Sequence, residues 1–268
     1  MTSETALRRH WPEYLIEACL LGAFMVSALG FTVLLEHPAS PVRGALPHAG
    51  LRRALMGLAM GGSAIALVYS PWGQRSGAHF NPALTLAFFR LGKIEPADAL
   101  GYVAAQFAGG VVGVLAIAGV LGSLVAAPTV NYAATLPGAP GPAAAFAAEL
   151  AISFATMLTV LTVSNHPRLA PHTPLFVGAL VATWISFEAP LSGMSMNPAR
   201  SFGSAAGAGL FDSLWIYFAA PALGMLLAAE TFVRVSPRKV HCAKLHHANA
   251  TRCIFRCGYH ELAATRET

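Results

Sequence analysis

Six apolar segments, each about as long as a bilayer is thick, limit what this 268-residue chain can fold into. A helix rises 1.5 Å per residue, so about 20 residues cross a hydrocarbon core of about 30 Å. Only 11% of the residues are charged, whereas soluble domains carry about 25%. Because lipid offers the backbone no hydrogen bonds, such segments must be helical. We therefore predict an all-α membrane protein with six transmembrane helices, at about Tyr14–Leu35, Leu51–Tyr69, Ala97–Val125, Ala143–Val163, Leu175–Ala189 and Ser213–Val233.

Basic residues outside these segments predict the orientation. Six spans place both termini on one side, and thirteen lysines and arginines fall on that side, against three (Arg43, Arg52 and Arg53) on the other. The positive-inside rule then places both termini in the cytoplasm. The polar residues 1–13 do not resemble a cleavable signal peptide. We expect a multi-pass protein of the plasma (inner) membrane.

Two short polar motifs interrupt the apolar pattern, "SGAHFNPAL" at 76–84 and "SGMSMNPAR" at 192–200. Asparagine caps helix N-termini well, and proline suits the first helical position. Each motif therefore predicts the start of a helix, at 81–90 and at 197–206, only about 15 Å long, which is half a membrane. The residues expected at the membrane midplane are Asn81, Pro82, Ala83, Asn197, Pro198 and Ala199.

The two halves of the chain repeat one order of features. In each half the first helix carries a glutamate, Glu17 in one half and Glu149 in the other. Two more helices follow, and the Asn-Pro-Ala loop lies between them. Three spans separate the two loops, so they enter from opposite sides, as in an inverted repeat of about 12–125 and 143–234. The two half-helices should meet tip to tip and complete a seventh, broken span.

Such an arrangement predicts a pore. Both half-helix N-termini direct partial positive charge at the centre, and the amides of Asn81 and Asn197 add donors. The loops 74–79 and 190–195 should line a wet path, since irregular backbone is tolerated in a membrane only where it is buried or meets water. A neutral hydrogen-bonding molecule could pass, while cations would be repelled. Proton coupling through Glu17 and Glu149, in an inverted-repeat carrier, is the alternative.

These motifs, six spans and paired glutamates resemble the major intrinsic protein family, the aquaporins and glycerol facilitators, over about residues 12–234. The chain is most similar to a bacterial-type aquaporin. The resemblance implies a channel domain at 1–234 and a basic tail at 235–268. It also implies a passive channel for water rather than an enzyme, with no cofactor, no nucleic-acid partner, and a homotetramer in the lipid bilayer with one pore per chain.

The resemblance assigns a second, narrower constriction outside the midplane. Arg200 corresponds to the arginine of this constriction, Met194 to the loop position and Ile185 to the fifth-helix position. The second-helix position is Met60 or Gly61. Arginine is permanently charged and offers a fork of donors. Family members specific for water have an aromatic residue and a histidine here, and glycerol facilitators have two aromatic residues, so this chain departs from both patterns.

Four further polar residues are interpreted as anchors of the re-entrant loops. The resemblance implies that Glu17 and Glu149 accept N–H bonds from the loops rather than carry protons. His79 and Gln106 are interpreted in the same way, because no nucleophile–base pair accompanies them.

The solute is predicted to be water first, with glycerol, urea or ammonia as alternatives. Ser201 and Ala205 stand where glycerol facilitators tend to have aspartate and a basic residue, and Tyr217 and Phe218 where they tend to have proline and leucine. A non-conducting adhesion or sensor protein on the same scaffold is a third hypothesis, which predicts an intact fold without flux.

The C-terminal tail falls outside the resemblance. Metal or redox gating through this tail is the alternative, but the spacing of its zinc ligands matches no compact zinc knuckle. We therefore expect no metal, free cysteines (Cys19 included) and a disordered basic tail near anionic lipid. The candidate zinc ligands weighed are Cys242, His246, Cys253, Cys257 and His260.

Overall fold

The computed structural model of the protein describes residues 3–247 and 251–260. Six of its helices are long and apolar enough to cross a membrane, and they match the six predicted segments. The polar residues before Tyr14 extend the first helix beyond its predicted start, and His10 there contacts Asp98 at 2.7 Å. The spanning helices are α1 (Ser3–Glu36), α3 (Ala49–Tyr69), α6 (Pro96–Leu121), α7 (Pro142–Ser164), α8 (Thr173–Phe187) and α11 (Leu214–Val235).

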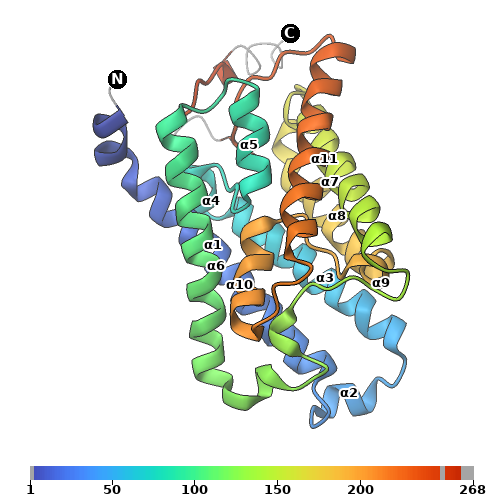
Figure 1. Ribbon diagram of the computed structural model, residues 1–268. Helices are drawn as coiled ribbons and strands as arrows, with labels where there is room; N and C mark the ends of the chain where they lie inside the picture. Colours follow the sequence, from blue (N-terminus) through green and yellow to red (C-terminus); the bar gives the residue numbers. More distant parts are fainter. Residues whose placement is uncertain (1–2, 248–250, 261–268) are drawn as a thin grey trace.

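Short helices complete the bundle, and no strand occurs within residues 3–247 or 251–260. The two half-helices, α5 and α10, begin at the prolines of the Asn-Pro-Ala motifs. The start of α1 and residues 251–260 lie at the same end of the bundle, here called the terminal face, and α2 lies at the opposite end (Figure 1). The short elements are α2 (Pro41–Ala45), α4 (Pro71–Ser76), α5 (Pro82–Arg90), α9 (Ala189–Ser192), α10 (Pro198–Ala208) and the 3-10 turns η1 (Gly122–Ala126), η2 (Asn131–Ala133) and η3 (Ala170–His172).

The packing of the helices follows the inverted repeat. Helix α1 packs along α6, and their counterparts in the second half, α7 and α11, pack in the same way. Helices α3 and α8 are also counterparts, and they pack against each other. Each half-helix lies on the last helix of the other half, α5 on α11 and α10 on α6. The two halves are therefore interlocked through the half-helices.

Glycines allow the closest helix contacts. A Cβ atom on Gly109 of α6 would lie 2.1 Å from the carbonyl oxygen of Ala18 in α1, and one on Gly61 of α3 would lie 2.4 Å from that of Gly178 in α8. Small residues let membrane helices approach to backbone contact, which increases their van der Waals attraction. Gly61 therefore belongs to the α3–α8 contact.

The chain beyond α11 packs against the bundle. Residues 236–247 and 251–260, called the C-terminal segment below, cross the terminal face (Figure 1). Ala243, Leu245 and Phe255 are buried in the same apolar core as the transmembrane helices. The expectation of a disordered tail is therefore wrong for these residues, because their apolar side chains fill the terminal end of the bundle.

Candidate pore and its relatives

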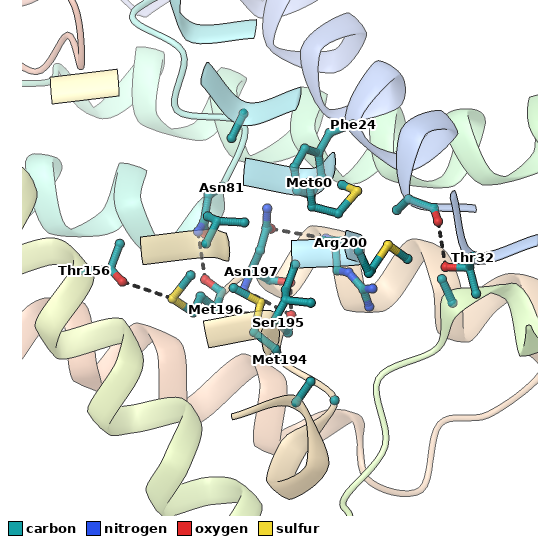
Figure 2. Close-up of a pocket in the computed structure, with 18 of the residues that line it drawn as sticks. Phe24, Thr32, Met60, Asn81, Thr156, Met194, Ser195, Met196, Asn197 and Arg200 are labelled. Atoms are coloured by element: carbon teal, nitrogen blue, oxygen red, sulfur yellow. Dashed lines mark hydrogen bonds between the residues drawn. The ribbon is translucent and has the colours of Figure 1, made fainter. Parts of the chain in front are cut away.

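A cavity of about 520 Å³ runs between the two halves of the protein. Near α2 its lining includes Glu36 and Arg52, and further inward it includes Asn81 and Asn197 (Figure 2). Toward the terminal face the lining includes Leu245 of the C-terminal segment. The cavity thus follows the path on which the sequence predicts a pore.

Each asparagine of the two motifs caps its own half-helix. The Asn81 side-chain oxygen accepts the N–H of Ala83 at 2.9 Å, and that of Asn197 accepts the N–H of Ala199 at 3.1 Å and of Arg200 at 3.2 Å. A capping oxygen satisfies amides at a helix start that have no partner within the helix. Pro82 and Pro198 follow as the first helical residues.

The same two asparagines tie the halves together. The Asn81 amide donates to the Met196 carbonyl at 2.8 Å, and the Asn197 amide donates to the Phe80 carbonyl at 2.7 Å (Figure 2 draws the first bond). Each hydrogen bond joins the asparagine of one Asn-Pro-Ala motif to the residue that precedes the asparagine of the other motif. An asparagine amide carries two N–H groups, and both asparagines line the cavity.

The loops before the half-helices have matching, strained backbones. Positive φ occurs at Gly77, Ala78 and Phe80 in the first loop, and at Gly193, Met194 and Met196 in the second. A non-glycine residue with positive φ is uncommon and needs support from its surroundings.

Buried glutamates supply this support in both halves. Glu17 accepts the N–H groups of His79 and Phe80 at 3.0 and 2.5 Å. Glu149 likewise accepts the N–H groups of Ser195 and Met196, both at 2.7 Å. The carboxylates thus satisfy amides that would otherwise be unpaired inside the membrane, where an unpaired amide costs several kcal/mol.

A serine and a tyrosine in each half complete this support, and the sequence analysis missed their part in it. Ser76 and Ser192 donate to Glu17 and Glu149, at 2.7 and 2.8 Å. Their carbonyls accept the hydroxyls of Tyr102 and Tyr217, at 2.5 and 2.6 Å. The signal was available: each Ser-Gly pair precedes the motif, and a tyrosine follows each asparagine by about one helix length.

His79 and Gln106 also lie at the first loop. Gln106 donates to Glu17 at 2.9 Å and to Thr85 at 3.1 Å. The His79 ring lies between the rings of Phe88 and Phe255, with centroids 5.3 and 5.5 Å away. It also lines the cavity, so its position links the loop, the pore and the C-terminal segment.

A candidate residue for each of the four positions of the outer constriction lines the cavity. Met60, Ile185, Met194 and Arg200 do so, and Gly61 instead faces α8. Among the described residues, Nη1 of Arg200 has no hydrogen-bond partner. Phe24 of α1, which the sequence analysis did not single out, also lines the cavity (Figure 2).

The profile of one known family, the major intrinsic proteins, matches residues 4–232. The chain belongs to the major intrinsic protein family. This family consists of membrane channels rather than enzymes. The residues that match its profile cover the six-helix bundle and leave out the C-terminal segment. The protein is thus an integral membrane protein of a channel family.

The names of the relatives within the family refer to different solutes. Glycerol uptake facilitator protein-like 6 of Lactiplantibacillus plantarum is 35% identical over 220 residues, which are 81% of this chain and 94% of that protein. Aquaporin NIP3-1 of Zea mays is 37% identical over 182 residues, 67% of this chain and 59% of that protein. The aquaglyceroporin from Plasmodium falciparum has the same fold, with a TM-score of 0.66 at 20% identity, over 84% of this chain and 96% of that one.

Proposed function

We propose that this major intrinsic protein is a passive channel for water and for small uncharged polyols of the size of glycerol. The observation that carries the proposal is the mixed lining of the cavity, to which Arg200 contributes donors and Met60, Ile185 and Met194 contribute apolar side chains. A glycerol-like molecule has a polar edge of hydroxyls and an apolar edge of C–H groups. A lining with both donors and methyl groups complements both edges.

The polyol part of the proposal departs from the sequence-based prediction of water as the first solute. Tyr217 and Phe218, which had favoured water, are absent from the described lining of the cavity. The Tyr217 hydroxyl instead donates a hydrogen bond to the Ser192 carbonyl, and Phe218 is 37% exposed on the surface of the bundle. Neither aromatic ring therefore narrows the path, so neither argues against a solute larger than water.

Exclusion of cations follows from the charges that face the path. The two half-helix N-termini meet at Asn81 and Asn197, where each contributes about half a positive charge. The Arg200 guanidinium adds a full charge farther out. A hydrated cation would have to lose water molecules while these positive charges repel it. A neutral solute instead replaces its hydrogen bonds to water with hydrogen bonds to Arg200 and the asparagines.

The orientation and assembly are part of the same proposal. The positive-inside distribution of basic residues supports a terminal face on the cytoplasmic side. A homotetramer, with one pore in each chain, is the assembly we propose.

The test compares water and glycerol flux through one variant and its control. Proteoliposomes with the wild-type protein should shrink fast in an impermeant osmolyte and re-swell fast in glycerol, as followed by stopped-flow light scattering. The Ile185→Phe variant adds volume to the apolar wall, so glycerol flux should fall at least about tenfold, equivalent to about 1.4 kcal/mol, and water flux should fall less. Val112→Phe, on the exposed face of α6, is the matched control and should change neither rate.

Two results would contradict the proposal. A wild-type protein that conducts water but not glycerol would be a water channel, as the sequence analysis preferred. Saturable uptake that follows a proton gradient would indicate a carrier instead.

A further inference from the structure

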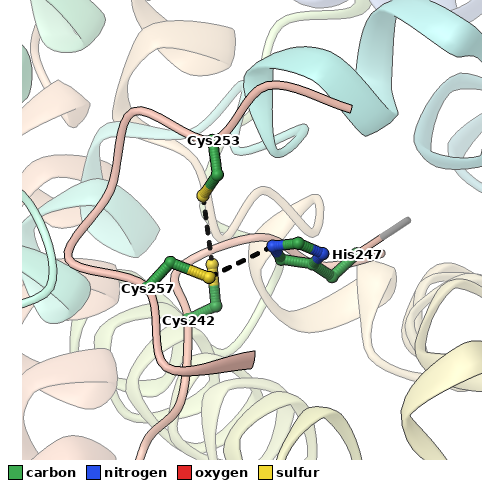
Figure 3. Close-up of side chains that lie close together, drawn as sticks. All are labelled: Cys242, His247, Cys253 and Cys257. Atoms are coloured by element: carbon green, nitrogen blue, oxygen red, sulfur yellow. Dashed lines mark hydrogen bonds between the residues drawn. The ribbon is translucent and has the colours of Figure 1, made fainter. Parts of the chain in front are cut away.

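Four potential metal ligands gather in the C-terminal segment. They are Cys242, His247, Cys253 and Cys257, and their ligand atoms all lie within 4.8 Å of one another (Figure 3). The Cys242 and Cys253 sulfurs are 3.6 Å apart, and Nε2 of His247 lies 3.2 Å from the Cys257 sulfur. His246 and His260, which the sequence also suggested, are not members of this group.

The Cys242–Cys253 distance is the one expected between two ligands of a tetrahedral ion, and the other ligand atoms lie close enough, within 4.8 Å, to reach the same ion after small shifts. Zinc binds thiolate sulfur at about 2.3 Å and imidazole nitrogen at about 2.0 Å, so ligand atoms on a regular tetrahedron lie about 3.5 to 3.8 Å apart. A disulfide needs its sulfurs about 2.05 Å apart, and all four cysteines of the chain are free. Three thiolates and one imidazole are a common ligand set for structural zinc.

The surroundings suit a bound zinc ion. The Cys257 sulfur accepts the backbone N–H of Tyr259 at 3.4 Å, and the Tyr259 ring stacks on the His247 ring with centroids 4.1 Å apart. Such contacts orient ligands and tune the metal. Lys244, which is buried, lies two residues after Cys242 in the same segment. Zn²⁺ with three thiolates has a net charge of −1, which Lys244 balances.

The group lies where the C-terminal segment meets the pore. The Ala243 carbonyl accepts from Nε2 of His79 at 2.8 Å, and the Leu245 amide donates to the Gly77 carbonyl at 3.1 Å. Lys244 donates to the Gln74 carbonyl at 2.7 Å. Three consecutive residues thus bind the first re-entrant loop, and the Leu245 side chain lines the cavity.

We propose that Cys242, His247, Cys253 and Cys257 bind one Zn²⁺ ion, which holds the C-terminal segment across the terminal mouth of the pore and restricts flux. The restriction of flux rests on the proposed channel function. The segment has only one short helical turn among its described residues, so it has little regular structure of its own to hold it in place. Zinc binding can supply the folding energy that such a segment lacks.

The first test measures zinc and needs no transport. Full-length protein, purified with a histidine-free tag and loaded with Zn²⁺, should retain about one zinc per chain after desalting, by elemental analysis. Cys253→Ser and Cys257→Ser should each weaken zinc binding at least about tenfold. Cys19→Ser, outside the group, is the matched control and should keep the wild-type zinc content. Co²⁺ in place of zinc should show the thiolate charge-transfer and d–d bands of a tetrahedral sulfur site.

Absence of zinc from the loaded wild type, or equal zinc in Cys253→Ser and wild type, would overturn the metal site. A Cys242–Cys253 disulfide in protein purified under non-reducing conditions, with no zinc bound, would overturn it as well.

The second test measures flux in the same samples. Zinc removal by a membrane-permeant chelator should raise water permeability several-fold in wild type, and added Zn²⁺ should reverse the rise. The Cys253→Ser protein should already be fast and insensitive to the chelator. Leu245→Ala should keep its zinc yet conduct faster, because the site is intact and the side chain in the pore is shortened.

The two tests fail in different ways. Zinc that binds as expected while removal leaves flux unchanged would overturn the closure of the mouth. No flux in any state, with zinc bound, would instead contradict the proposed channel function and leave the metal site supported.

Discussion

Glu188 is a buried carboxyl just beyond α8 whose environment sets its protonation. Glu188 is only 7% exposed. Burial disfavours the charged form and raises the pKa of Glu188 from 4.5 to about 7. The folded protein therefore holds a proton here that the unfolded chain releases above about pH 4.5.

The protein should lose stability as the pH rises through this window. Because the folded pKa is the higher one, the contribution of Glu188 to stability is fully present below pH 4.5 and declines up to about pH 7. Glu188→Gln removes the titrating group, so it should unfold at a higher temperature than wild type at pH 8 and at nearly the same temperature at pH 4.5. Thermal unfolding in detergent at both pH values measures the difference; a difference that does not depend on pH would contradict the prediction.

Single residues show where sequence reasoning succeeds and where it stops. The capping roles of Asn81 and Asn197 follow from local chemistry, because an asparagine before a proline suits a helix start in any surroundings. The choice between Met60 and Gly61 does not, since adjacent helical residues point about 100° apart and only the position of α8 shows which one meets the cavity.

At the scale of the helices, close contact depends on glycine at particular positions. Gly109 of α6 lies against the backbone of α1, whereas a Cβ on Gly119, in the same helix, would meet no atom of a neighbouring element within 4 Å. The density of glycines in the sequence predicts tight packing in general. It does not tell these two positions apart, because that depends on how α6 rotates against α1.

Alanine at these two glycines should therefore have opposite consequences. Gly109→Ala would place a methyl group against a backbone oxygen, so α1 and α6 would have to separate, at a cost of about 1–3 kcal/mol. Gly119→Ala, with open space around it, should be neutral or slightly stabilising. Unfolding by titration with a denaturing detergent compares the two, and equal stabilities would show that the α1–α6 contact is not limiting.

At the scale of the whole molecule, the two halves meet at the asparagine links. The bonds from Asn81 to Met196 and from Asn197 to Phe80 cross the same junction, so each should depend on the other. Asn81→Ala and Asn197→Ala should each cost about 1–3 kcal/mol. The double variant should cost less than their sum by at least about 0.5 kcal/mol.

A double-mutant cycle on unfolding free energies measures this coupling. Asn81→Ala combined with Cys19→Ser, an exposed position, provides the additive control. Strict additivity for the two asparagines would mean that the junction does not act as a unit.

The sequence by itself determined the six spans, the inverted repeat and the two half-helices of this protein. These features depend on hydrophobic length, charge placement and capping, which are properties of residues close together in the chain. The bond from Tyr102 to Ser76, the choice of Met60 and the place of His247 beside Cys242, Cys253 and Cys257 came only from the tertiary structure. They depend on the separation and rotation of segments distant in sequence. Such geometry is decided by packing across the whole bundle rather than by any local pattern.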